Sequence, residues 1–222
     1  MKKIISVIMI FAMLLTFAAC KNNEKIPTRD ELVSVSPEEA EELFEDMTDL
    51  AANGKYDKAV ENYVAGAAGA EDEELLNWYF YALAMNEYEN YGCIGYPLTL
   101  MQYNIDEDFE LGQNAITELS LKAREYNGIY HFNGTYVYML DGKVAFSVGE
   151  QLTDIAFTSY ELGYKAGKFF ILKRNNDGTH EKVYSIDYNN GILSVFAVDE
   201  NKEDMYAGSY VLMPGEYPEI LY

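Results

Sequence analysis

Two cysteines and two histidines are the side chains of this 222-residue chain best suited to nucleophilic or metal chemistry. Cys93 has no histidine near it in sequence, and His131 and His180 do not have the H-x-x-x-H spacing of a metal-binding pair. We expect Cys93 to be a small buried apolar residue. We expect both histidines in strand regions, at the surface or in hairpins, although two histidines could meet across a barrel. No catalytic residue, metal ligand or cofactor is therefore predicted.

The other cysteine, Cys20, follows a segment that predicts export and lipid attachment. Lys2 and Lys3 precede 16 uncharged residues, Ile4 to Ala19, a run shorter than the roughly 20 residues that span a bilayer as a helix. This pattern is typical of a secretory signal peptide. Residues 16–20, Thr-Phe-Ala-Ala-Cys, resemble the lipobox of bacterial lipoproteins, although that family prefers Leu where Phe17 stands. An ordinary signal peptide with a chance cysteine, or an uncleaved anchor helix, is the alternative.

The lipobox resemblance implies a position and a chemistry for the N-terminus. Residues 1–19 would be removed as the signal peptide, and the Cys20 sulfur would form a thioether to diacylglycerol. Residues 20–36 would be the lipidated N-terminus and a polar tether on the extracytoplasmic face of the cell membrane. Each buried methylene contributes about 0.8 kcal/mol and one acyl chain binds only marginally, so two chains are expected to hold the protein stably.

The strongly acidic composition excludes one class of partner. The net charge is −21, and loss of Lys2 and Lys3 with the signal peptide would take it to −23. Such a surface repels phosphate backbones, and no basic stripe with interleaved aromatic residues is present, so nucleic acid is excluded as a partner. The same charge is repelled by anionic lipid head groups. Membrane attachment is therefore expected to depend on the lipid at Cys20.

Residues 37–127 are predicted to form a helical region. Ser36-Pro37-Glu38-Glu39 is a strong helix start, with Ser as N-cap and Pro at the first position, and Asn53-Gly54 is a helix end. Helical spacing of apolar residues predicts further helices after Tyr56, from about residue 72 to 90, and from about 108 to 125. Residues 54–63 resemble the turn and second helix of a tetratricopeptide repeat, in a single copy where about three repeats are needed for stable stacking.

Acidic residues raise one question about metal binding and one about catalysis. Residues 106–110, Asp-Glu-Asp-Phe-Glu, offer oxygens for Ca²⁺ but lack the glycine and spacing of a calcium loop. An acidic helix N-terminus is the simpler interpretation. Paired carboxylates for glycoside hydrolysis stay open, because the fold and not the sequence spacing sets their separation.

Residues 128–222 are predicted to form an antiparallel meander β-barrel, which gives an α+β fold with the helical region first. Aromatic and β-branched residues alternate with polar ones from about Gly128 to Met213. Turn pairs that favour tight hairpins punctuate this region, at residues 133–134, 141–142, 177–178 and 190–191. The spacing predicts seven or eight strands in sequence order, and closing them into a barrel would remove exposed edges.

The barrel region resembles the small lipocalin-like domains of secreted bacterial lipoproteins. Asn127-Gly128-Ile129-Tyr130 stands where lipocalins begin their first strand with Gly-x-Trp, and Tyr130 replaces the tryptophan. The chain has 20 tyrosines, 12 of them from Tyr126 onward, which suits half-buried strands and also pockets for amphipathic molecules. We therefore expect a non-catalytic binding module with a small ligand in the barrel. A module that binds an envelope protein through the helical region is the alternative, and a hydrolase is a third reading.

Overall fold

The computed structural model describes residues 37–66, 73–157, 159–175, 178–198, 204–215 and 219–221. The chain divides into two compact units. Of the described residues, the helical unit contains those up to Glu87 together with Thr99–Ile116, and the barrel unit contains Tyr88–Leu98 and nearly all of those from Thr117 onward. Among the described helices, none combines the length and the apolar character that crossing a membrane requires.

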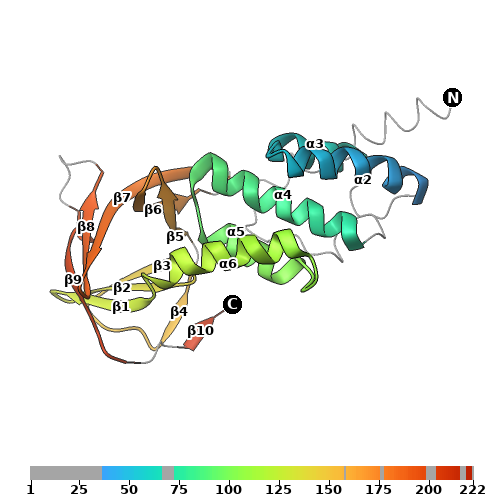
Figure 1. Ribbon diagram of the computed structural model, residues 1–222. Coiled ribbons are helices and arrows are strands. Elements are labelled where there is room, and N and C mark those ends of the chain that lie inside the picture. The colour runs from blue at the N-terminus through green and yellow to red at the C-terminus, as the bar shows by residue number, and fades with distance from the viewer. Residues whose placement is uncertain are drawn as a thin grey trace. The chain divides into compact units, whose positions relative to one another are not determined.

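The first two described helices form a hairpin, α2 (Pro37–Ala52) and α3 (Tyr56–Gly66) (Figure 1). The predicted start at Pro37 and end at Asn53-Gly54 are confirmed. Gly54 has a φ of +70°, and the N–H of Lys55 donates to the carbonyl of Leu50 at 2.9 Å. A left-handed glycine of this kind satisfies the last carbonyls of a helix and turns the chain.

Three more helices follow: α4 (Glu73–Tyr91), α5 (Gly95–Asn104) and α6 (Glu110–Arg124). Helices α4 and α6 were predicted, whereas α5 was not. In the helical unit, the rings of Trp78 and Phe109 meet edge-on with centroids 5.1 Å apart. The Asn77 side chain pairs with Asp106, donating to Oδ2 and accepting from the backbone N–H, each at 2.9 Å. These contacts fix the segment between α5 and α6 against α4.

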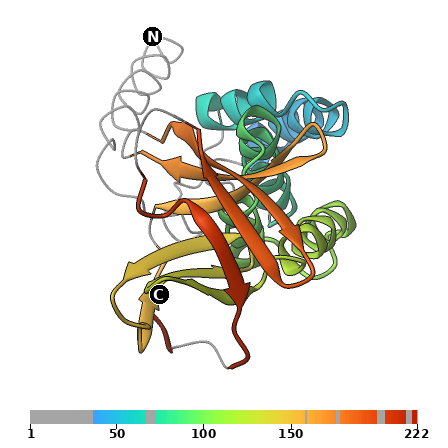
Figure 2. The ribbon, with the colours of Figure 1, turned by 90° about the vertical axis from the view of Figure 1, so that its left-hand side faces the viewer.

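Eight antiparallel strands form the predicted closed barrel. In barrel order they are β1 (Gly128–Phe132), β2 (Thr135–Leu140), β3 (Lys143–Val148), β5 (Tyr160–Lys165), β6 (Lys168–Arg174), β7 (His180–Asn189), β8 (Ile192–Ala197) and β9 (Gly208–Leu212). The pairs Tyr130↔Leu212 and His131↔Val211 join β9 to β1 and close the barrel. Figure 2 shows the strands of the barrel, coloured from yellow-green for β1 to red for β9.

The hairpin turns explain why neighbouring strands pair in sequence order. Asn133-Gly134, Asp141-Gly142 and Asn190-Gly191 have positive φ at both residues, as a type I′ turn requires and as their sequences predict. The turn between β5 and β6 is Ala166-Gly167, with φ of +53° and +77°, and it carries no Asn or Asp signal. The local chemistry therefore predicts three of these turns and misses the fourth.

Ring contacts between strands that are not neighbours identify the inner face of the barrel. Tyr130 of β1 meets Tyr188 of β7 with centroids 6.1 Å apart, and Phe146 of β3 meets Tyr184 of β7 at 5.6 Å. Because β7 pairs only with β6 and β8 in the barrel, these contacts must cross its interior. Aromatic rings therefore meet inside the barrel at two levels.

A short parallel pair, β4 (Asp154–Ala156) with β10 (Glu219–Leu221), lies outside the barrel order and was not predicted. Ile155 of β4 is buried in a cluster with Ile129 and Tyr138. The Tyr138 hydroxyl accepts a hydrogen bond from the N–H of Leu152 at 2.8 Å. This segment covers the face of β1 and β2 opposite to the one that carries Tyr130.

Candidate functional site

Of the residues singled out for chemistry, Cys20 lies outside the described part of the chain, and the other three are placed by the structure. Cys93 is buried and forms no disulfide, as expected for a small apolar residue. His131 and His180 both lie in strands, β1 and β7. His131 is a hairpin histidine, since its Nε2 accepts the N–H of Gly134 at 3.1 Å.

The expected surface or hairpin position is wrong for His180. Its side chain is fully buried, and its Nε2 lies 2.8 Å from Oε1 of Glu161, a buried carboxylate on β5. The ring of Tyr91 covers the imidazole, with centroids 4.6 Å apart. The histidine is therefore held between a strand of the barrel and the end of α4.

The acidic segment at residues 106–110 lies at the N-terminus of α6, as the simpler interpretation predicted. Asp106 precedes α6 and accepts hydrogen bonds from the N–H of Phe109 at 3.2 Å and from the Gln113 side chain at 3.0 Å through its carbonyl. Its carboxylate accepts from Asn77. These bonds use Asp106 to fix the turn that leads into the helix.

An aromatic cluster lies inside one end of the barrel, the end at which β1 turns into β2. We call Phe146, Tyr160, Tyr184 and Tyr206 the mouth cluster. Phe146 is its centre, stacked on Tyr206 with centroids 4.4 Å apart, edge-on to Tyr160 at 5.2 Å and tilted against Tyr184 at 5.6 Å. Tyr184 is buried, whereas the other three rings are half-buried. Flat apolar surface is thus partly accessible at this end.

One carboxylate, that of Asp204, lies beside the mouth cluster. The Tyr184 hydroxyl donates to Asp204, at 3.0 Å from Oδ1 and 2.9 Å from Oδ2, and the N–H of Tyr206 donates to Oδ1 at 2.8 Å. Burial, together with the hydrogen bond and charge of Asp204, raises the pKa of Tyr184. The hydroxyl therefore stays protonated and fixes the carboxylate beside the rings.

The opposite end of the barrel is filled by aromatic side chains. Tyr126, which follows α6, is buried and packs on Phe169 and Tyr188, with centroid distances of 4.6 and 5.6 Å. Its carbonyl accepts a hydrogen bond from the hydroxyl of the fully buried Tyr130 at 2.8 Å. The two ends thus differ: one is plugged from α6, and the other presents half-buried rings and a carboxylate.

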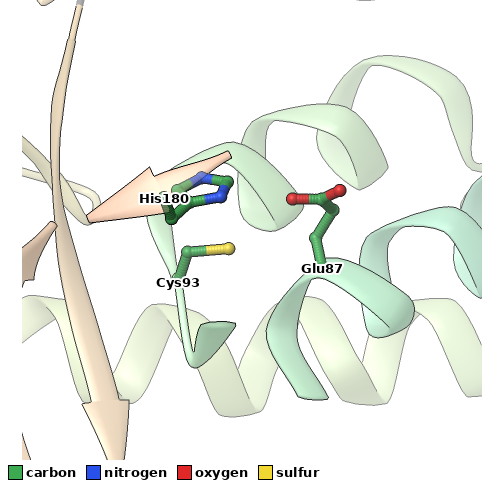
Figure 3. Close-up of side chains that lie close together, drawn as sticks. All are labelled: Glu87, Cys93 and His180. Carbon is green, nitrogen blue, oxygen red and sulfur yellow. The ribbon is translucent and has the colours of Figure 1, made fainter. Parts of the chain in front are cut away.

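A second cluster of reactive side chains surrounds His180 outside the barrel wall. One potential ligand atom each of Glu87, Cys93 and His180 lie within 4.8 Å of one another, and Figure 3 shows the three side chains pointing toward a common region. Glu87 is in α4, and the residues that follow it in that helix, Tyr88–Tyr91, belong to the barrel unit with Cys93 and His180. No sequence pattern had linked these three residues.

The Glu161 carboxylate is held from two sides. Oε1 contacts His180, and Oε2 accepts the N–H of Tyr96 at 2.9 Å, at the N-terminus of α5. An ionised carboxylate has only acceptors, so in a neutral imidazole this contact requires the proton on Nε2 of His180 and leaves the lone pair on Nδ1.

Gly92, Cys93 and Ile94 form the link between α4 and α5, and backbone hydrogen bonds join this link to β5. The N–H of Tyr164 donates to Gly92 at 2.8 Å, the N–H of Ile94 donates to Leu162 at 2.9 Å, and Cys93 pairs with Gly163 as an isolated bridge. The link therefore acts as a short additional strand on the barrel wall. This pairing fixes Cys93 on the outer face of the barrel wall, next to the buried Phe170 and Leu172.

Replacing Gly92 by alanine is expected to loosen this link. Gly92 has a φ of +74°, and an added Cβ would lie 2.6 Å from the Tyr164 carbonyl oxygen. Gly134 is the matched control, because its φ is +79° but an added Cβ meets nothing within 4 Å. The left-handed conformation costs each alanine roughly 1–2 kcal/mol, and the carbonyl contact adds to that cost only at Gly92. Urea unfolding midpoints should therefore fall further for Gly92→Ala; equal losses would contradict the close contact.

Comparisons with protein-family models, with curated proteins and with solved structures give no match for this chain.

Proposed function

We propose that this protein is a lipid-anchored, extracytoplasmic binding module whose barrel takes a small amphipathic ligand at the mouth cluster. The observation that carries the proposal is the set of three half-buried rings, Phe146, Tyr160 and Tyr206, with the Asp204 carboxylate fixed beside them. Binding sites for small molecules combine apolar and aromatic walls with a few fixed polar groups. The mouth cluster has both.

The rings that meet inside the barrel limit how deep a ligand can reach. Tyr130, Val137, Leu193 and Tyr210 are at most 1% exposed on the inner face, and ring contacts cross the interior. A ligand buried in the centre of the barrel, as the sequence had led us to expect, would have to displace these side chains. The proposal therefore places the ligand at the end of the barrel. There Phe132 and Val148 also leave 45% and 58% of their surface exposed.

The charges at the mouth indicate which amphipathic molecules fit. Asp204 offers acceptor oxygens and a negative charge, and tyrosine and phenylalanine faces attract cations with about 0.5–2 kcal/mol. The net charge of −21 repels anions over the whole surface. A ligand with an apolar ring and a cationic or hydrogen-bond-donating group is favoured over an anionic one.

Three probes of similar shape and different charge test this proposal: benzyltrimethylammonium, benzyl alcohol and phenylacetate. Calorimetric titration is expected to show the tightest binding for the cation, weaker binding for the alcohol and none for the anion. Tyr206→Leu should weaken binding of the cation roughly tenfold, because it removes one stacked ring worth about 1 kcal/mol or more. Asp204→Asn should bring the cation close to the alcohol in affinity.

Tyr103→Leu is the matched control, since Tyr103 is 66% exposed in α5 and makes no part of the mouth cluster. Its affinity for all three probes should equal that of the unmodified protein. Absence of heat from every probe at millimolar concentration, or an affinity that Tyr206→Leu leaves unchanged, would reject the mouth cluster as the binding site.

The alternative of an interaction module rests on fewer observations. Among the described helical residues, the large apolar side chains that are exposed are Tyr103, Leu111 and Leu121. Single exposed apolar residues are normal on protein surfaces, whereas an interaction site needs a contiguous patch of several hundred Å². The hydrolase reading gains a histidine–carboxylate pair in His180 and Glu161, but their side chains are only 0% and 7% exposed, which leaves a substrate no access.

A further inference from the structure

We propose that Glu87, Cys93 and His180 bind a transition-metal ion of the zinc class. The three side chains come from α4, from the link before α5 and from β7, and each offers a ligand atom within 4.8 Å of the others. The site is separate from the mouth cluster, because it lies outside the barrel wall and not in its interior. It gives a joint chemical role to the buried thiol and the buried histidine.

The distances leave room for an ion. Zinc bonds of about 2.0–2.3 Å in tetrahedral geometry place ligand atoms roughly 3.3–3.8 Å apart. The 4.8 Å limit within which the three atoms lie is therefore about 1 Å larger than a loaded site requires. Rotation of the Glu87 side chain, the longest of the three, can supply such a contraction. The burial of Cys93, of the His180 side chain and of Glu87 Oε2 keeps bulk water from competing for the ion.

His180 already has the orientation of a metal ligand. Its Nε2–H donates to Glu161, and the second oxygen of that carboxylate is held by the N–H of Tyr96. Histidines that bind metals commonly donate their other ring N–H to a carboxylate, which fixes the tautomer and strengthens the ligand. Here this arrangement leaves the buried Nδ1 as the coordinating atom. Glu161 is thus a positioning residue for His180.

The donor set selects the metal. A thiolate and an imidazole suit zinc and related transition metals, whereas Mg²⁺ and Ca²⁺ prefer oxygen ligands alone. Binding deprotonates the thiol: the Cys93 S–H bond breaks, the sulfur keeps the electron pair and bonds the metal, and one proton passes to solvent. Three protein ligands leave the fourth tetrahedral position for a water molecule.

Cobalt(II) titration tests the site in the full chain carrying Cys20→Ala, kept in mild detergent. Cys93 is then the only thiol of the protein, so any cobalt–thiolate absorption in the near ultraviolet reports on it. We expect this absorption to saturate at one Co²⁺ per chain, to release one proton per ion, and to disappear when Zn²⁺ displaces the cobalt. Zinc should also raise the melting temperature, because it binds the folded state alone.

The variants separate ligation from folding. Cys93→Ala and His180→Gln should abolish the absorption while circular dichroism shows an intact fold, and Glu161→Gln should keep it but weaken affinity roughly 10- to 100-fold. His131→Gln, at the other histidine, is the matched control and should bind as the parent does. No absorption with the folded parent, or an absorption that survives Cys93→Ala, overturns the proposal.

Discussion

Replacing Cys20 by alanine is expected to move the whole protein from the membrane fraction to the soluble fraction. The predicted thioether to diacylglycerol would be lost with the sulfur. A chain with a net charge of −21 has no electrostatic attraction to anionic lipid that could replace it. One acyl chain gives an association constant of only about 10⁴ M⁻¹, and two chains give stable attachment. Removing both should therefore change partitioning by orders of magnitude.

Cell fractionation with immunoblotting measures this change, and mass spectrometry of the N-terminal peptide reports the lipid directly. Cys93→Ala is the matched control: it removes the other cysteine, which the structure places in the barrel unit, and should leave the protein in the membrane fraction. A Cys20→Ala protein that stayed with the membrane would show that lipid on this cysteine is not the anchor. That result would favour an uncleaved N-terminal helix.

The sequence predicts most of the fold because the signals for helices and hairpins are local. Pro37 and Gly54 mark the ends of α2, and three Asn-Gly or Asp-Gly pairs mark barrel turns. Helix α5 escaped prediction because seven of its ten residues are buried, so a clear alternation of apolar and polar faces is missing. Proline in its first turn is also easily taken for a helix breaker, although it is tolerated there.

Neither candidate site could be assembled from sequence spacing. Tyr206 and Phe146 meet only because the barrel closes. Glu87, Cys93 and His180 meet because the link before α5 pairs with β5. His180 was expected near the surface, as hairpin and strand-end histidines usually are. The ring of Tyr91 and the carboxylate of Glu161 bury it, and both belong to segments distant from it in sequence. Tertiary contact, not local pattern, created both sites.

Raising the pH from 10 to 12 is expected to destabilise the barrel through its buried tyrosines. Burial, with nearby carboxylates adding to it, raises the pKa of Tyr126 to about 12 and that of Tyr210 to about 12. In the unfolded chain both phenols ionise near pH 10. The stability that depends on their protonated forms is complete below pH 10 and falls as the pH rises toward 12. The loss reaches roughly 2–3 kcal/mol for each group, against typical domain stabilities of about 5–15 kcal/mol.

Urea unfolding midpoints at a series of pH values from 8 to 12 measure this loss. Tyr126→Phe and Tyr210→Phe should each flatten the decline, because phenylalanine has no proton to lose. Tyr210→Phe should also lower stability slightly at pH 8, since it removes the 2.8 Å hydrogen bond to the carbonyl of Tyr206. Tyr103→Phe, at an exposed tyrosine, should leave the slope unchanged. The excess negative charge of the protein grows with every tyrosine that ionises. A decline equally steep in all three variants would therefore mean that general charge repulsion, and not the two buried phenols, drives alkaline destabilisation.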